Sequence, residues 1–144
     1  MTKVIGITGG IGSGKTTLSK HLTKLGYLVH ESDKVVFEMY DNPSKHFINF
    51  VKKNISKDAV KGDQLNKNEI TKNVFTNNQN KKKLEKYIHK KVQLSRKKFI
   101  QNNLKDPNKI IFVDIPLLLE KKLENEFDLV ICVISSKINR TKRV

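Results

Sequence analysis

Apolar residues along the chain fall into four short blocks, separated by longer and more polar stretches. The blocks lie at residues 4–8, 27–29, 110–113 and 129–134, and they contain mostly β-branched and aromatic or other large apolar side chains. Short apolar runs of this kind are typical of parallel strands that are buried on both faces. The sequence therefore predicts four strands of one parallel sheet.

The stretches between the first blocks repeat apolar residues every three or four positions, which predicts helices. The first helix begins at Lys15, carries leucines on one face and ends at Gly26. A second helix passes through residues 35–40 and breaks at Asn42 and Pro43. Strands and helices that alternate in this way indicate a sheet covered by helices on both faces.

The middle of the chain, about residues 44–104, is polar and predicted to be helical. We expect a short helix around residues 47–51, a helix that Asn66 caps, and a long helix from Leu84 to Ile100. Residues 106–108, Asp-Pro-Asn, end the long helix. This helical excursion separates the second strand from the third.

Two further helices are predicted near the end of the chain. One covers residues 117–120, after the third strand, and the other begins at Ser135 and Ser136. The chain then ends at Val144, where that last helix is only starting. We therefore expect a domain that is incomplete at its C-terminus.

The composition indicates a globular protein, with 37% apolar and 30% charged residues. No stretch of the sequence reaches the apolar length that a bilayer span needs, and the N-terminus resembles a strand more than a signal peptide. The single cysteine, Cys132, lies in the apolar run of the fourth strand, where we expect a buried core residue. These features favour a cytoplasmic protein with no membrane partner.

The formal net charge of +15 has two interpretations. A basic field attracts anions, including nucleic acid, ATP or an anionic small substrate. Lysine, asparagine and isoleucine are abundant throughout, however, which is typical of an AT-rich coding sequence, and few aromatic residues stand between the lysines. We therefore expect no nucleic-acid partner, and take the charge as helpful to anionic ligands.

Residues 9–16, G-G-I-G-S-G-K-T, match the phosphate-binding loop pattern G-x-x-x-x-G-K-[ST] in full. The glycines let successive backbone N–H groups converge on phosphates, and the helix that follows adds the positive end of its dipole. A strand directly before the loop and a helix directly after it distinguish this match from a glycine-rich turn. The nucleotide-binding residues that we expect are Gly12, Ser13, Gly14, Lys15, Thr16 and Thr17.

This motif defines the expected fold and its cofactors. The fold class is α/β, a three-layer α/β/α P-loop nucleoside triphosphate hydrolase fold with a parallel sheet and an inserted helical substrate lobe. We expect one domain over residues 1–144, with a core at about 1–40 and 108–144 and the lobe at about 41–107. ATP and Mg²⁺ are the expected cofactors: Lys15 reaches the terminal phosphates, and the hydroxyl of Thr16 binds the metal.

A P-loop alone does not distinguish kinases from GTPases or binding modules. The N-K-x-D motif by which GTPases recognise guanine is absent from the later part of the chain, and an ATP-driven motor needs a longer sequence. A short P-loop domain with an inserted helical lobe fits a small-molecule kinase best. Asp33, just after the second strand, is then either the base that accepts the proton of an attacking hydroxyl or an N-cap of the next helix.

Four segments of the chain resemble dephospho-coenzyme A kinases. Residues 8–17 resemble that family's T-G-G-I-G-S-G-K-S-T, and residues 26–33 its G-x-x-V-x-D-A-D. Residues 84–89 are similar to L-E-x-x-x-H-P, and residues 114–120 to D-x-P-L-L-x-E, which shikimate and nucleoside monophosphate kinases lack. The resemblances are collinear and run to about Val133.

The resemblance implies an enzyme that transfers the γ-phosphoryl group of ATP to the ribose 3′-hydroxyl of dephospho-coenzyme A, the last step of coenzyme A synthesis. It implies that Asp33 is the base and, with Lys15, a catalytic residue. It also places His89, Asp114 and Glu120 in the substrate region. Without the resemblance, His89 is a solvated helix residue and Glu120 a member of a surface ion pair. Asp114, at the end of the third strand, is then either an acid that binds Mg²⁺ through water or orients the substrate, or a cap or turn residue.

Some positions depart from the family pattern. Glu31-Ser32-Asp33 replaces D-A-D and keeps an acid at both ends, and Lys90 replaces the proline after the histidine. The family continues into a lid that carries arginine, and only Arg140 and Arg143 stand where it would begin. We therefore expect the 144-residue chain to bind ATP weakly and to catalyse little. The alternatives are another small-molecule or nucleotide kinase of the same fold, or a non-catalytic ATP-binding fragment.

Overall fold

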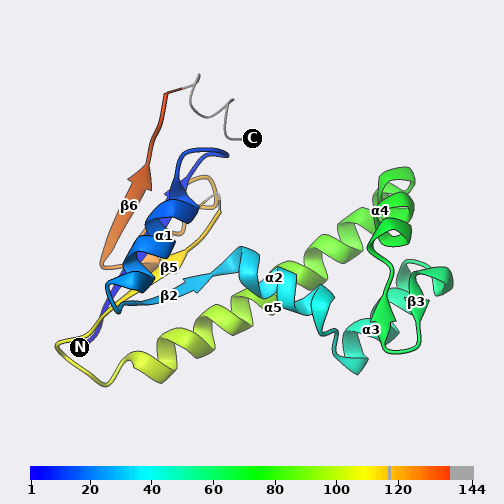
Figure 1. Cartoon of the computed structure of the whole chain (residues 1–144), viewed down its shortest axis with the longest axis horizontal. Coiled ribbons are helices and arrows are strands. Elements are labelled where there is room, and N and C mark those ends of the chain that lie inside the picture. Colours follow the sequence, from blue (N-terminus) through cyan, green and yellow to red (C-terminus); the bar gives the residue numbers. More distant parts are fainter. Residues whose placement is uncertain (117, 137–144) are drawn as a thin grey trace. The chain divides into compact units, whose positions relative to one another are not determined.

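The computed structural model of the protein describes residues 1–116 and 118–136 (Figure 1). The chain divides into two compact units, one made of residues 1–32 and 96–144, the other of residues 33–95. We call the first the core unit and the second the helical unit. The helical unit has one cluster of buried apolar side chains, and the core unit has two, one on each face of its sheet.

The core unit contains the four predicted strands in one parallel sheet. Their order across the sheet is β2-β5-β1-β6, and every pair is parallel. The strands are β1 (Lys3–Gly9), β2 (Leu28–Glu31), β5 (Ile110–Asp114) and β6 (Leu129–Val133). Each predicted apolar block corresponds to one of these strands, so the strand prediction is confirmed.

Apolar side chains pack on both faces of this sheet, as the continuous apolar runs predicted. Helix α1 (Lys15–Lys24) covers one face, where Leu22 packs with Ile7 and Phe112. The last turns of α5 (Asn78–Asn103) and the segment after β5 cover the other face, where Phe99 and Leu118 belong to the same cluster. The α/β fold class with helices on either side of a parallel sheet is therefore confirmed.

Helix α1 ends at the predicted glycine. The amide of Gly26 donates to the carbonyl of Thr23, and the amide of Tyr27 donates to the carbonyl of Leu22. This pair of bonds is a Schellman motif, which requires a left-handed residue after the helix. Gly26 supplies it, with φ of 89°. The chain can therefore turn directly from α1 into β2.

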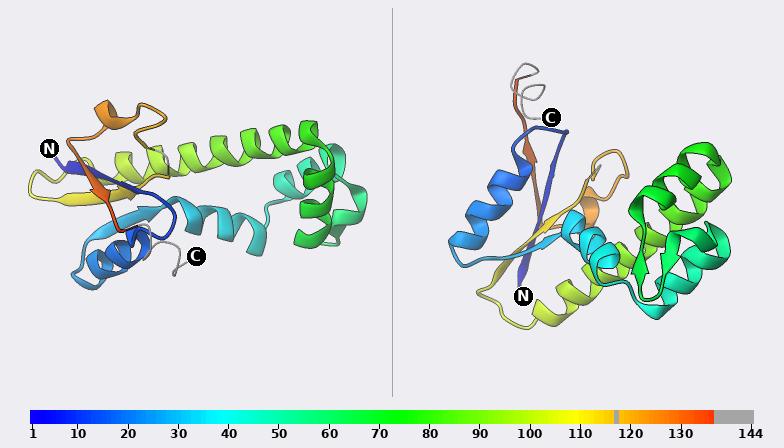
Figure 2. Two further views of the ribbon diagram at one scale, coloured as in Figure 1. Left: turned by 90° about the horizontal axis from the view of Figure 1, so that it is seen from above. Right: turned by 45° about the vertical axis from the view of Figure 1, so that its right-hand side comes forward.

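The helical unit is built from three helices, a small hairpin and residues 78–95 of α5 (Figure 2). Its elements are α2 (Ser32–Asp41), α3 (Lys45–Asn54), a 3₁₀ turn η1 (Lys57–Ala59), β3 (Val60–Lys61), β4 (Gln64–Leu65) and α4 (Lys67–Thr76). Buried side chains from α3 and the residue after it, from η1, α4 and α5, form one cluster: Phe47, Val51, Ile55, Ala59, Ile70 and Leu84. The ring of Tyr87 stacks on Phe50, with 4.2 Å between the ring centroids.

The predicted helices of this unit are present. The side chain of Asn66 accepts hydrogen bonds from the amides of Asn68 and Glu69, so it caps α4 as expected. The long helix spans 26 residues and ends three residues before Asp106. The β3–β4 hairpin was not predicted, because its strands have two residues each and are too short to show an apolar pattern.

The predicted helix at residues 117–120 is wrong. Residues 118–122 form turns, and the amide of Leu123 donates to the carbonyl of Leu118. Leu118 is fully buried, and a Cβ placed on Gly6 would lie 2.8 Å from its Cδ1 atom. Lys122 has a left-handed φ of 54°, which a continuing helix does not allow. The chain bends here because Leu118 packs onto the sheet.

Cys132 is exposed, which corrects the expectation of a buried core residue. It lies in β6, the strand at one end of the described sheet order. On this strand Val130 and Val133 contact the two core clusters, and Cys132 belongs to neither. An apolar run shows that a strand is favoured, but it does not show which of its positions a neighbouring element covers.

The predicted helix after Ser136 and the arginines Arg140 and Arg143 lie outside the described residues. Among residues 1–116 and 118–136, no helix combines the length and the apolar character that crossing a bilayer demands.

The bend after β5 yields a test. Leu118→Ala should lower the free energy of unfolding by about 2–5 kcal/mol, because it leaves a cavity against the sheet. Leu119→Ala should change it by less than about 1 kcal/mol, because Leu119 is 47% exposed. Urea unfolding followed by circular dichroism measures both. Equal losses for the two variants would contradict the inward packing of Leu118.

Candidate functional site

The loop between β1 and α1 has the backbone conformation that the glycine pattern predicted. Gly12 and Gly14 have left-handed φ values of 73° and 101°, which side chains disfavour. The amide of Ser13 donates to the carbonyl of Gly10, 3.1 Å away, and closes a tight turn between them. The loop thus needs glycine at both positions.

Gly9 is required for a different reason, which is space. A Cβ atom placed there would lie 2.5 Å from the hydroxyl oxygen of Ser13 and 2.8 Å from the carbonyl oxygen of Val133. The second neighbour is backbone of the adjacent strand and cannot move aside. The loop therefore packs directly on the end of β1 and β6.

The start of α1 offers unpaired N–H donors. Gly14 is the N-cap residue and provides no side-chain cap, and the first turn contains no acidic residue. The first helical bond runs from the amide of Leu18 to the carbonyl of Gly14. The amides of Lys15, Thr16 and Thr17 therefore have no partner in the described part of the chain, and they lie at the positive end of the helix dipole. This arrangement suits an anion such as a phosphate group.

Lys15 forms an ion pair with Asp114. Its Nζ atom lies 2.7 Å from Oδ1 of Asp114, and the side chains are only 13% and 6% exposed. The pair connects the phosphate loop to the end of β5, so two of the predicted site residues are brought together. Because both charges are largely shielded from water, each depends on the other for its stability.

The strand register places Asp114 between β1 and β2, where the strands reach their carboxyl ends. Asp114 lies opposite Ile7 of β1 on one side and opposite Glu31 of β2 on the other. Its carbonyl accepts a hydrogen bond of 2.8 Å from the hydroxyl of Ser32, which is buried. The carboxyl ends of three strands thus meet at one place, as parallel strands require.

Ser32 is a site residue that sequence reasoning missed. Its hydroxyl fixes the end of β2 to the end of β5, across 82 positions of the sequence. Asp33, the predicted base, is the next residue and lies in the first turn of α2, where it is exposed. No local pattern identifies Ser32, because its partner is a backbone atom far along the chain.

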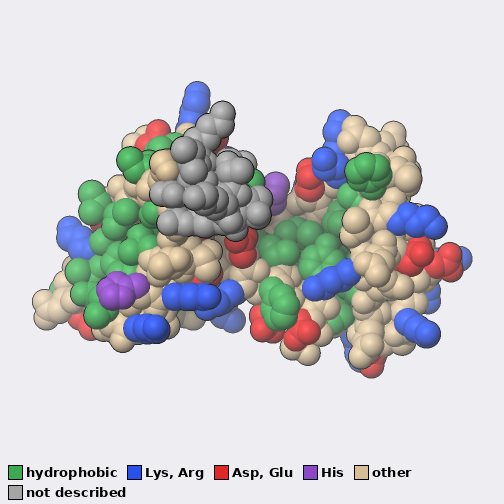
Figure 3. All heavy atoms as spheres, turned by 45° about the horizontal axis from the view of Figure 1, so that its top comes forward, with side chains coloured by type: hydrophobic (Ala, Val, Ile, Leu, Met, Phe, Trp, Pro, Cys, Tyr) green, Lys and Arg blue, Asp and Glu red, His purple; other side chains and the backbone are tan. Residues whose placement is uncertain are grey.

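The remaining predicted residues are solvent-accessible. Thr16 and Thr17 are exposed in the first turn of α1. Glu120 is exposed in the turns after β5, and His89 is exposed on α5. The described residues contain no group of three or more histidine, cysteine, aspartate or glutamate side chains suited to hold a metal ion. Figure 3 shows Lys and Arg side chains at many places over the face drawn.

Arg96 is a second buried cation of the core unit, and its charge acts on His30 of β2. His30 of β2 and Arg96 of α5 are 7% and 6% exposed. Burial lowers the pKa of His30 below its usual 6.5, and the nearby charge of Arg96 lowers it further. His30 also contacts the ring of Phe99, with 5.4 Å between centroids. The folded protein therefore favours the neutral imidazole more than the unfolded chain does.

The Lys15–Asp114 pair leads to a double-mutant cycle. Lys15→Met and Asp114→Asn should each destabilise the protein, because each leaves a shielded charge without its partner. The double variant should lose less than the sum of the two, by about 1–3 kcal/mol. Urea unfolding of the four proteins gives this coupling energy. Strict additivity would show that the two side chains do not interact.

The lowered pKa of His30 predicts how stability changes with pH. Below about pH 6.5 the unfolded chain takes up a proton at His30 that the folded chain resists. The free energy of unfolding should therefore fall as the pH drops from 7 to 5.5, and His30→Gln should reduce this slope. His21→Gln, at an exposed position of α1, is the matched control. An unchanged slope in His30→Gln would refute this account.

Comparisons with known proteins identify the family of this chain. The sequence model of the family described as Dephospho-CoA kinase matches residues 3–144. A protein of Bartonella henselae named dephospho-CoA kinase is 32% identical over 132 residues. That match covers 91% of this chain and 66% of the relative, so the chain spans slightly less than two thirds of that relative's length.

Two solved structures have a similar fold. The crystal structure of TT1252 from Thermus thermophilus matches with a TM-score of 0.72 and 29% identity, and the match covers 99% of this chain and 71% of that one. A dephospho-CoA kinase from Campylobacter jejuni matches with a TM-score of 0.68 and 18% identity, over 99% of this chain and 94% of that one, and it supports the fold alone. The family match extends over nearly all of the sequence, phosphate loop included, and on this basis the chain belongs to the dephospho-CoA kinase family.

Proposed function

We propose that the protein is an ATP-dependent kinase that phosphorylates the ribose 3′-hydroxyl of dephospho-coenzyme A. One observation carries the proposal: a phosphate loop whose Lys15 is paired with Asp114, in a chain that the family model matches over residues 3–144. ATP and dephospho-coenzyme A are the proposed substrates. Coenzyme A is the product, so this reaction would be the final step of its synthesis.

The phosphate loop fits a nucleotide. The backbone amides of Lys15, Thr16 and Thr17 all lie in the first turn of α1. The loop glycines have no side chains, so a phosphate group can come close to the backbone. In this proposal these amides bind the β- and γ-phosphates together with Gly12, Ser13 and Gly14. The hydroxyl of Thr16 would bind Mg²⁺ beside them.

Lys15 has two partners in the proposed reaction. In the described structure it is paired with Asp114, 2.7 Å away. A bound triphosphate would compete with Asp114 for the ammonium group, because phosphate oxygens are strong acceptors of charge-assisted hydrogen bonds. Asp114 would then keep Lys15 oriented at the loop, or bind the magnesium ion through water. The ATP molecule supplies the phosphoryl group that is transferred.

Asp33 is the proposed general base. It is exposed, and it directly follows Ser32, whose hydroxyl is anchored to the end of β5. A carboxylate at this place would accept the proton of the attacking 3′-hydroxyl, which raises the nucleophilicity of the oxygen. His89 and Glu120 are exposed and are proposed to contact the acceptor.

The role of Asp33 can be tested against a matched residue on the same helix. Asp33→Asn should lower phosphoryl transfer to dephospho-coenzyme A by about 100-fold or more and leave ATP affinity unchanged, because it removes the base and not a phosphate ligand. Asp41→Asn makes the same chemical change at the other end of α2 and should have no effect.

Phosphoryl transfer to dephospho-coenzyme A is measured with the full-length gene product, by coupling the release of ADP to the oxidation of NADH. Titration calorimetry with magnesium and ATP gives the nucleotide affinity. Shikimate and nucleoside monophosphates serve as competing acceptors. Full activity in Asp33→Asn would remove Asp33 from the mechanism, and preference for another acceptor would overturn the proposed substrate.

A further inference from the structure

One buried hydroxyl ties the first turn of α2 to the sheet of the core unit. Ser32 begins α2 and is 5% exposed, and in this fully described helix it is the only buried residue. Its hydroxyl donates a hydrogen bond of 2.8 Å to the carbonyl of Asp114, at the end of β5. Asp33, the proposed base, is the next residue and is exposed. The backbone that carries the exposed carboxylate is therefore fixed by a buried neighbour.

This bond of Ser32 is not a helix cap. A serine at the start of a helix commonly caps it by accepting a hydrogen bond from an amide of the first turn. The bond of Ser32 runs in the other direction, because its hydroxyl donates to a carbonyl 82 positions away in the sequence. A donated bond satisfies no amide of α2. It therefore connects the start of the helix to the sheet.

The carbonyl that accepts this bond lies in a part of the sheet that is held from both sides. β5 pairs with β2 on one side and with β1 on the other. Directly after Asp114, the amide of Ile115 donates to the carbonyl of Ile7, 2.9 Å away, and both isoleucines are buried. The hydroxyl of Ser32 is thus bonded to an anchored atom, and losing the bond would release the chain where β2 ends.

Asp114 also connects this bond to the phosphate loop. Its carbonyl accepts from Ser32, and its carboxylate pairs with Nζ of Lys15, 2.7 Å away. One residue therefore contacts both the lysine of the loop and the residue before the proposed base. Phosphoryl transfer depends on alignment of the reacting groups, and a misplacement of about 1 Å can cost about 100-fold in rate. A bond at this position is suited to such alignment.

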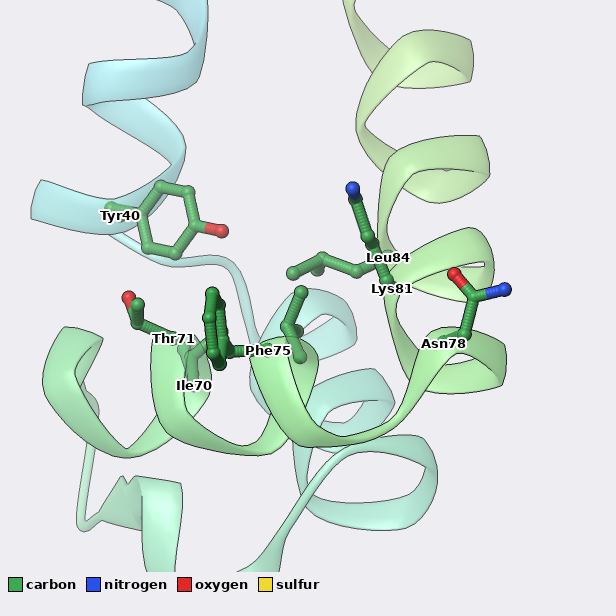
Figure 4. A pocket seen from close by; sticks show the side chains of 8 residues that line it. Tyr40, Ile70, Thr71, Phe75, Asn78, Lys81 and Leu84 are labelled. Carbon is green, nitrogen blue, oxygen red and sulfur yellow. The ribbon is translucent and has the colours of Figure 1, made fainter.

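The other end of α2 is held by apolar packing. Tyr40, in the last turn, packs edge-on against the ring of Phe47, with 5.5 Å between the ring centroids. Tyr40 also lines a pocket of about 450 Å³ within the helical unit, between α2, α4 and α5, with Ile70 and Leu84 in its wall (Figure 4). The described lining residues do not include Ser32. Loss of the Ser32 hydroxyl should therefore act on the first turn of α2 and leave this pocket unchanged.

We propose that Ser32 is a positioning residue of the kinase reaction: its bond to Asp114 holds the first turn of α2 so that the carboxylate of Asp33 meets the attacking hydroxyl. This inference rests on the proposed function, because it takes Asp33 as the base. Ser32 touches neither substrate and acts on the rate through Asp33. Removal of its hydroxyl should therefore slow the transfer and leave the binding of ATP unchanged.

The first test is Ser32→Ala in the full-length gene product. Alanine stands at this position in the pattern D-A-D that residues 31–33 resemble, so the variant should fold, and a lower rate reports the bond that this chain has in addition. We expect kcat with dephospho-coenzyme A to fall about tenfold or more. The dissociation constant of ATP, measured by calorimetry, should stay within about twofold of the parent value. An unchanged kcat, or an equal loss of ATP affinity, would overturn the proposal.

Thr2→Val is the matched control. Thr2 is also buried, and its hydroxyl donates to carbonyls far along the chain, those of Asn103 and Asp106. It precedes β1, however, so it lies at the opposite end of the parallel sheet from Ser32. Thr2→Val should lower the urea midpoint of unfolding at least as much as Ser32→Ala does, and leave kcat unchanged. Equal losses of kcat in the two variants would reveal a general effect of stability and overturn the proposal.

A double variant shows whether Ser32 acts through Asp33. In the Asp33→Asn background, Ser32→Ala should lower the residual rate by less than about twofold, because no carboxylate is left to position. A merely structural role would lower the rate by the same factor in both backgrounds. That result would overturn the positioning role.

Failure of this inference and failure of the proposed function give different results. If dephospho-coenzyme A is phosphorylated and Ser32→Ala is as fast as the parent, the function stands and the positioning role is wrong. If transfer goes instead to shikimate or to a nucleoside monophosphate, and Ser32→Ala slows it only while Asp33 is present, the positioning role stands and the proposed substrate is wrong.

Discussion

β1 pairs in parallel with β5 over five residues, from Lys3 with Ile110 to Ile7 with Asp114, and the candidate site depends on this register. The two strands are separated by about a hundred residues of sequence, yet the pairing sets the end of β5 beside the loop that leaves β1. A register shifted by one residue would turn the Asp114 side chain to the opposite face. The ion pair between Lys15 and Asp114 would then be impossible.

The phosphate loop combines features that cost stability with features that suit an anion. Left-handed glycines lose more backbone entropy on folding than other residues, and an uncapped helix start leaves donors unpaired. The family match and the paired Lys15 give these features a consistent explanation, because a bound triphosphate would satisfy the donors. These costs are offset by the structure that surrounds the loop. Here the compensation comes from a sheet whose two faces are both covered by apolar side chains.

The helical unit has a core of its own, built on Phe47, Val51 and Leu84, and this core also supports its pocket. Ile70 and Leu84 serve both purposes, since each contacts the core cluster and lines the cavity. The core thus holds this part of the wall in place, while Thr71, Asn78 and Lys81 lie on exposed helix positions. Those positions can differ among relatives at little cost in stability, because surface substitutions rarely change folding much.

The four strands of the parallel sheet, the α-helices and the phosphate loop of this protein follow from local patterns in its sequence. Apolar runs indicate strands, three-to-four spacing indicates helices, and the glycines with Lys15 indicate phosphate binding, because each depends on residues that are close in the sequence. The tertiary structure alone decided the pairing of Lys15 with Asp114 and the anchoring of Ser32. It also decided that Leu118 turns inward and that Cys132 is exposed. These features depend on which distant segment covers a residue or accepts its hydrogen bond, and no local pattern carries that information.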